Sequence, residues 1–273
     1  MRQHLAAVGI VLTFTLGATL SLEAQYNPQA RLQPQGLGAS PTFEGWYQNA
    51  DGTYTLSFGY FNLNTQETLS IPVGENNFVS PGELDQGQPT YFTPRRSYGI
   101  FTVTVPAEFG GEDRVTWTLE AAGQRYAIPG GIIDSYETAN LHAPAINAFP
   151  PYLVMSEGGP EVEGPNGAWI EKSAVVGEPL QLRVQAWDRL DTPVTVRWYK
   201  YRGPGDVTFS EDAIRIEAGS RDALTSASFT EPGEYVLYAR ADHTTRRVAE
   251  AGLEQCCWTN GYVTVTVSNQ YVP

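Results

Sequence analysis

The chain has 273 residues, of which 41% are hydrophobic and 17% charged, and its formal net charge is −13. This composition excludes a disordered chain and is typical of a globular protein long enough for two domains. The acidic balance argues against nucleic acid as a partner, since binding to it requires Lys and Arg to neutralise phosphates, and against anionic membrane surfaces.

The first 24 residues have the pattern of a secretory signal peptide. Residues 1–4 are polar with one firm positive charge, residues 5–22 are almost wholly apolar, and Glu23-Ala24-Gln25 closes the run. We expect cleavage after Ala24 and export to the periplasm, cell surface or extracellular space. The alternative is an uncleaved anchor, for which the run is short. No later segment is apolar enough to cross a membrane, so we expect no membrane span in the mature chain.

The first strand patterns follow a leader at residues 25–41 that is rich in Gln, Pro and Gly and is predicted to be flexible. Residues 54–60 then alternate aromatic or apolar with small side chains, and Asp51-Gly52 before them is a hairpin signal. A further strand is predicted to begin at Leu69, which would make three adjacent strands an antiparallel meander.

Residues 74–97 hold no convincing strand pattern and are long for a structureless connection, which predicts a functional loop or an Ω-loop. Alternation returns at residues 101–105 and 115–119, and a short return strand ends near Pro129. We therefore predict a first β-sandwich domain at residues 42–131. Residues 132–167 are repeatedly interrupted by Pro and Gly and are predicted to be a linker, in which residues 150–155 could add an edge strand to either domain.

A second sandwich is predicted at residues 168–268, followed by a short tail at 269–273. About seven strand patterns fit into these roughly 100 residues, the number expected of an immunoglobulin-like sandwich. One of the strands carries Trp198 at an inward position. Another carries Leu237 after the turn at Pro232-Gly233. The predicted fold class is thus all-β, with two antiparallel, immunoglobulin-like sandwiches after a signal peptide and leader.

The second sandwich resembles the polycystic-kidney-disease (PKD) or immunoglobulin-like domains of bacterial secreted proteins. The residues that carry the resemblance are Gly177–Leu182, the Trp198 strand, Glu231–Tyr235 and Gly261–Val267. The resemblance covers about a third of the chain and implies a fold but no catalytic residues. It implies that Tyr235 is the tyrosine-corner residue, whose hydroxyl bonds to the upstream backbone. Unlike true immunoglobulin domains, the chain lacks the two core cysteines.

The two cysteines, Cys256 and Cys257, are adjacent and lie with Trp258 in an over-long loop at residues 243–259. In an oxidising compartment they should pair. Adjacent Cα atoms are only ~3.8 Å apart, however, against about 4.4–6.8 Å in ordinary disulfides. A vicinal disulfide would therefore be strained, and the alternatives are buried thiols, an intermolecular bridge or a metal site. Trp258 would either stack on a sugar or partner, or cover the end of the sandwich.

Arg95 and Arg96 are a second candidate, because guanidinium forks match carboxylates and would suit an anion or carbohydrate site. The alternative is an internal salt bridge that holds the long loop to the sandwich.

No cofactor or metal site is predicted. His142 and His243 lack further ligands at zinc spacing. Asp188, Asp191 and Asp242 could meet at a loop end and bind Ca²⁺, but the stronger interpretation is that they are solvated carboxylates that stabilise turns.

These patterns favour an exported, non-catalytic protein that binds an unidentified protein or carbohydrate through the loop ends of its sandwiches, in an adhesion or scaffold role. The alternatives are a small secreted hydrolase that uses two carboxylates, and a purely structural spacer. Exposed aromatic side chains would favour binding, and a cleft with two close carboxylates would favour the hydrolase.

Overall fold

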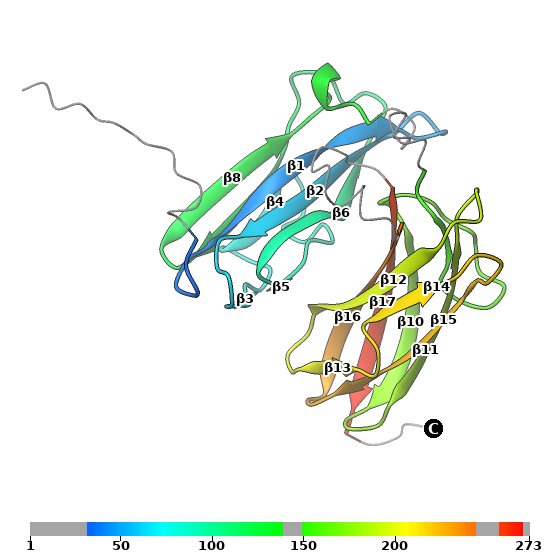
Figure 1. Ribbon diagram of the computed structural model, residues 1–273. Coiled ribbons are helices and arrows are strands. Elements are labelled where there is room, and N and C mark those ends of the chain that lie inside the picture. The colour runs from blue at the N-terminus through cyan, green and yellow to red at the C-terminus, as the bar shows by residue number, and fades with distance from the viewer. Residues whose placement is uncertain (1–31, 139–148, 244–256, 270–273) are drawn as a thin grey trace, which may run out of the picture. The chain divides into compact units, whose positions relative to one another are not determined.

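The computed structural model describes residues 32–138, 149–243 and 257–269 (Figure 1). They belong to one compact unit that begins at Leu32. Nearly all of its regular structure is β-strand. The predicted signal peptide and the start of the leader lie outside the described residues. Within the described part of the chain, no helix has the length and hydropathy needed to cross a membrane.

The first half contains three small sheets, ordered β1-β2-β6, β4-β7-β8 and β3-β5, and all their pairs are antiparallel. A 3₁₀ turn, η2, follows at Asp134–Tyr136. The strands are β1 (Ala39–Gln48), β2 (Tyr54–Asn62), β3 (Leu69–Ser70), β4 (Asn77–Ser80), β5 (Tyr91–Phe92), β6 (Arg95–Val105), β7 (Val115–Ala121) and β8 (Gln124–Gly130).

The core of this half is aromatic. The alternating residues of β2, β6 and β7 point into it, as the sequence predicts, and Phe58, Phe101 and Trp117 are almost completely buried. The ring centroids of Phe101 and Trp117 are 4.8 Å apart in an edge-to-face arrangement, a favourable geometry for aromatic pairs.

Two predictions for this half are wrong. The strand that begins at Leu69 is only two residues long and pairs with β5, so β2 lies between β1 and β6 and there is no three-strand meander. The stretch 74–97 contains β4, which pairs with β7. This strand is hidden in the sequence because its first inward side chain is Asn77, which is buried and bonds to the carbonyls of Ile71 and Pro89. A polar residue at an inward position interrupts the hydrophobic alternation.

The second half is a sandwich of two sheets, ordered β10-β17-β16-β12-β14 and β13-β15-β11-β9. This distribution of strands is immunoglobulin-like. The strands are β9 (Tyr152–Val154), β10 (Ala168–Val175), β11 (Leu180–Trp187), β12 (Val194–Arg202), β13 (Val207–Phe209), β14 (Ala213–Ile216), β15 (Asp222–Phe229), β16 (Gly233–His243) and β17 (Trp258–Ser268).

Two features of this sandwich follow the sequence analysis and one departs from it. Strand β9 supplies the edge strand foreseen at residues 150–155, and it pairs with β11. The Tyr235 hydroxyl donates to the Glu231 carbonyl and accepts from the Gly205 amide, both at 2.9 Å, which confirms the tyrosine corner. Strand β10, however, runs parallel to β17, so the sandwich is not wholly antiparallel.

Part of the outer face of the five-stranded sheet is also buried. Tyr201, Tyr238 and Tyr262 each have 2% or less of their surface exposed and belong to the same apolar cluster as the core of the first half. The Tyr262 hydroxyl donates to the carbonyl of Ile100 on β6 at 2.9 Å. The two halves are therefore joined by a packed aromatic contact, which the sequence analysis did not foresee.

Candidate functional site

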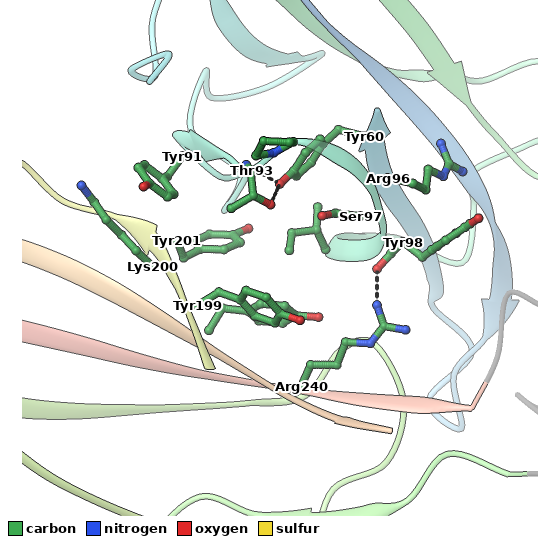
Figure 2. Close-up of a pocket in the computed structure, with 13 residues that line it drawn as sticks. Tyr60, Tyr91, Thr93, Arg96, Ser97, Tyr98, Tyr199, Lys200, Tyr201 and Arg240 are labelled. Carbon is green, nitrogen blue, oxygen red and sulfur yellow. Dashed lines mark hydrogen bonds between the residues drawn. The ribbon is translucent and has the colours of Figure 1, made fainter. Parts of the chain in front are cut away.

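A pocket of about 250 Å³ opens where β5 and β6 meet β12 and β16 (Figure 2). Among the described residues, its lining contains two arginines, one lysine and no Asp or Glu, although the whole chain has 30 acidic and 17 basic residues. Six of the other lining residues are tyrosines: Tyr60, Tyr91, Tyr98, Tyr199, Tyr201 and Tyr238.

Strand β12 presents its outward side chains to the pocket. Inward-facing Trp198 belongs to the sandwich core, and the next residue along, Tyr199, therefore points the other way. Tyr199 pairs across the ladder with Tyr238 of β16, and their rings stack at a centroid distance of 5.7 Å. A register shift between Lys200 and Arg202 marks a β-bulge. The bulge lets two consecutive residues, Lys200 and Tyr201, both line the pocket.

Strand β6 forms the opposite wall, and it is also irregular. Its register with β2 shifts between Phe58 and Tyr60, so that Tyr60 pairs with Ser97. Gly99 lies in the shifted segment with a φ of +49°, a left-handed conformation that glycine adopts easily. The residues on either side of it, Tyr98 and Ile100, both line the pocket.

Arg96 is held by a buried carboxylate. Its Nη2 lies 2.7 Å from Oε1 of Glu44, whose side chain is 3% exposed and also accepts a hydrogen bond from Thr42. Burial raises the pKa of Glu44, while the nearby guanidinium of Arg96 opposes that rise. The guanidinium also lies 4.6 Å from the centre of the Tyr98 ring. Arg96 is therefore fixed in place at the edge of the pocket.

Arg240 enters the pocket from β16 and has weaker internal partners. Figure 2 shows its Nη1 directed at the Tyr98 carbonyl, at 3.5 Å. Its Nε is 3.5 Å from Asp242, which already accepts two shorter hydrogen bonds from Arg197. The guanidinium also lies 4.7 Å from the Trp258 ring centre. Arg240 thus keeps donor capacity that its protein neighbours use poorly.

Lys200 lies at the other end of the pocket. Its Nζ donates to the Gly205 carbonyl at 2.6 Å and lies 4.6 Å from the Tyr91 ring centre. Burial lowers the pKa of Lys200 from its ordinary 10.5, and burial raises the pKa values of Tyr199 and Tyr238. At neutral pH the phenols are consequently neutral hydrogen-bonding groups.

The structure separates the residues that the sequence analysis singled out. Arg96 lines the pocket and also makes the internal salt bridge considered as its alternative role. Arg95 is exposed, begins β6 and is not part of the pocket lining. Trp258 is 3% exposed and its ring packs against Gly99 of β6, so the ring is buried inside the protein and is not exposed at a loop end. Cys257 is buried and disulfide-bonded, and Cys256 lies outside the described residues.

The sequence did not predict three of the residues that shape the pocket: Tyr199, Lys200 and Arg240. The available signal was the run Trp198-Tyr199-Lys200-Tyr201, in which large aromatic residues occupy both faces of one strand. A strand that is aromatic on both faces is packed on both faces.

The carboxylates considered for Ca²⁺ do not gather into a site. Asp188 caps its own turn by accepting from Leu190 and Thr192, whereas Asp242 pairs with Arg197. His243 bonds to the Phe149 carbonyl, and His142 lies outside the described residues. Among the residues that the structure describes, no group of three metal-ligating side chains is found.

Comparisons with known proteins give only distant likenesses. No family model matches the chain, and no curated protein matches it in sequence. Among solved structures, a PapD-like domain of human CEP192 is similar over 45% of this chain and 89% of its own, with 8% identity and a TM-score of 0.31. The D0–D1 domain of intimin covers 84% of this chain and 100% of its own, with 12% identity and a TM-score of 0.26. Tandem immunoglobulin domains of titin cover 86% and 100%, with 12% identity and a TM-score of 0.23. With TM-scores this low, the fold assignment rests on the strand order described above.

Proposed function

We propose that this chain is an exported, non-catalytic binding protein, and that its ligand site is the pocket between β5–β6 and β12–β16. The observation that carries the proposal is the lining itself: six tyrosines and three cations around one concavity in an otherwise acidic chain. Concave sites with aromatic walls and a few convergent polar groups are the usual form of small-ligand sites. Export is proposed from the sequence pattern of residues 1–24.

The proposal moves the ligand away from the loop ends. Trp258, one of the loop residues considered first, packs against Gly99 and beside Arg240. In this proposal it supports one wall of the pocket and does not contact the ligand. The carboxylate-pair hydrolase has no support at this pocket, because a pair of Asp or Glu is the chemistry it needs and the lining holds neither.

A glycan array probed with the labelled, full-length exported chain tests this function. The array should hold neutral, sulfated and uronic-acid glycans, and we expect selective binding to at least one class. Tyr199→Ala should abolish that binding because it removes a wall of the pocket, and Lys200→Gln is a second, milder pocket variant. Tyr126→Ala on β8, away from the lining, is the matched control. An array without signal, or a signal that both pocket variants retain, would contradict the proposal and favour the structural spacer.

A further inference from the structure

The charge of the pocket indicates the sign of its ligand. Among the described residues, three cationic side chains and no carboxylate line it. Glu44 and Asp242 lie beside Arg96 and Arg240, and Asp206 and Glu231 act on Lys200 from outside the lining. In a chain of net charge −13, a pocket lining with three cations and no carboxylate favours an anionic ligand over a cationic one. A ligand with one negative charge complements this site.

Arg240 is the residue best placed to bind that charge. Arg96 donates to Glu44 at 2.7 Å and Lys200 donates to Gly205 at 2.6 Å, so both already have short hydrogen bonds. The Nε of Arg240 is buried and lies 3.5 Å from Asp242, so a ligand in the pocket would meet the two Nη groups. Nη1 has only a 3.5 Å contact with the Tyr98 carbonyl. A carboxylate on the guanidinium would supply the short, bidentate contacts that the protein does not.

The walls and the size of the pocket indicate the rest of the ligand. Tyr91, Tyr98 and Tyr199 are only partly buried, and flat rings of this kind pack against the C–H face of a sugar. The hydroxyls of Thr93 and Ser97 add polar groups that suit a polyhydroxylated ring. At about 250 Å³ the pocket is smaller than the usual range of about 300–1,000 Å³ for drug-sized ligands. It therefore matches a single ring with a short substituent.

We propose that the pocket binds one uronic-acid residue of an acidic glycan, with the carboxylate on Arg240 and the sugar ring against the tyrosines. This inference rests on the proposed function and specifies its ligand class. The ligand would contact β6 of the first half and β12 and β16 of the second at the same time. Its binding should therefore raise the melting temperature of the whole protein.

The test is calorimetric titration of the full chain with galacturonate and three matched probes. Galactose carries an uncharged hydroxymethyl group where galacturonate has its carboxylate, galactose 6-phosphate carries a phosphate ester at that carbon, and acetate lacks the ring. We expect galacturonate to bind about 10- to 100-fold more tightly than galactose or acetate, the usual effect of a hydrogen-bonded charge, and to weaken as salt is raised. Arg240→Gln should remove that advantage, whereas Arg240→Lys should retain part of it because it keeps the charge but loses the fork. Arg221→Gln, which removes a cation outside this pocket, is the matched control.

The outcomes separate this inference from the proposed function. Equal binding of galactose and galacturonate would overturn the uronic-acid inference and leave a binding protein. Tighter binding of galactose 6-phosphate than of galacturonate would overturn the carboxylate and indicate a phosphorylated ligand. If acetate bound as tightly as galacturonate, the sugar ring would have no part in recognition and the uronic-acid inference would fail. If no probe binds and the glycan array is also silent, both proposals fail. If Arg240→Gln does not fold, the probe series and its salt dependence on the unmodified chain decide the question.

Discussion

The side-chain amide of Asn260 donates a 2.8 Å hydrogen bond to the backbone carbonyl of Gly99. The same amide donates to the Pro165 carbonyl, and its oxygen accepts from the hydroxyl of Tyr238. Asn260 belongs to β17 and Gly99 to β6, so one buried amide ties the second sandwich to the first half. Because every one of these groups is buried, the loss of a partner would be costly, and the contact fixes how β6 meets β17 beside the pocket.

Gly99→Ala should be strongly destabilising. A Cβ at this position would lie 2.1 Å from a carbon of the Trp258 ring, and φ is +49°. We expect a loss of about 2–5 kcal/mol in unfolding free energy, as the sum of left-handed strain and overpacking. Gly36→Ala is the matched control, since its φ is also positive but no atom lies within 4 Å, and it should cost only about 1–2 kcal/mol. Equal losses in urea melts would show that the Trp258 contact is absent.

Tyr235→Phe tests the tyrosine corner. The change removes the hydroxyl that bonds to Glu231 and Gly205 and leaves the buried Gly205 amide without that acceptor. We expect a loss of about 1–3 kcal/mol in a denaturant melt. Tyr126→Phe, on the return strand β8, removes a hydroxyl from a partly exposed site and should change stability by less than about 0.5 kcal/mol. A loss no larger than that of the control would mean that the corner contributes nothing.

Trp198→Ala tests the core of the second sandwich. The Trp198 side chain is 2% exposed and packs among the inward residues of both sheets, so its removal should cost about 3–5 kcal/mol. Trp169 is half-exposed and stacks on Tyr262, and Trp169→Ala should cost no more than about 1.5 kcal/mol. If the Trp198 variant lost less than ~1 kcal/mol, the register of β12 would be wrong.

Glu44→Gln tests the buried carboxylate behind Arg96. Burial raises the pKa of Glu44 above its ordinary 4.5, so the folded state holds this proton more tightly than the unfolded state. The contribution of Glu44 to the unfolding free energy is therefore fully present below pH 4.5, and it is lost as the pH rises through the pKa that Glu44 has in the folded state. The unfolding free energy of the unmodified protein minus that of Glu44→Gln should therefore be larger at pH 4 than at pH 7.

Glu217→Gln is the control for that measurement. Arg215 lowers the pKa of the exposed Glu217, so its contribution is present above pH 4.5 and is lost as pH falls. The unfolding free energy of the unmodified protein minus that of Glu217→Gln should therefore change little with pH, and should be slightly larger at pH 7 than at pH 4. A larger difference for Glu44 at pH 7 than at pH 4 would show that the Arg96 contact outweighs burial.

The two cysteines give a prediction about redox state. Cys257 is disulfide-bonded in the structure, and the sequence offers only Cys256 as a partner within the chain. We expect the intact mass of the oxidised monomer to be two hydrogens below that of the dithiol, with no thiol open to alkylation. The closed loop is minimal, so reduction should change the unfolding free energy by about 1 kcal/mol or less. Two readily alkylated thiols, or a covalent dimer, would contradict a vicinal bond.

The sequence by itself determined the inward faces of the strands. Val194, Val196 and Trp198 alternate with more polar residues, and all three lie in the core, because side chains of a strand point to opposite faces with a period of two. The tyrosine corner was implied by the resemblance at Glu231–Tyr235, and its Glu231 partner is only four residues upstream. The second partner, Gly205, is 30 residues away and is brought to Tyr235 by the fold. Where a polar residue took an inward position, as Asn77 does, the same rule missed the strand.

Only the tertiary structure decided what covers the outward faces. Tyr199, Tyr201 and Tyr238 occupy positions that the period-two pattern treats as outer, and nothing in their own strands specifies the wall that β6 supplies. The pocket depends on two bulges and on pairs such as Arg240 and Tyr98, which are 142 residues apart. Local periodicity records which way a side chain points, whereas burial, ion pairing and a shared cavity depend on the distant strand that packs against it.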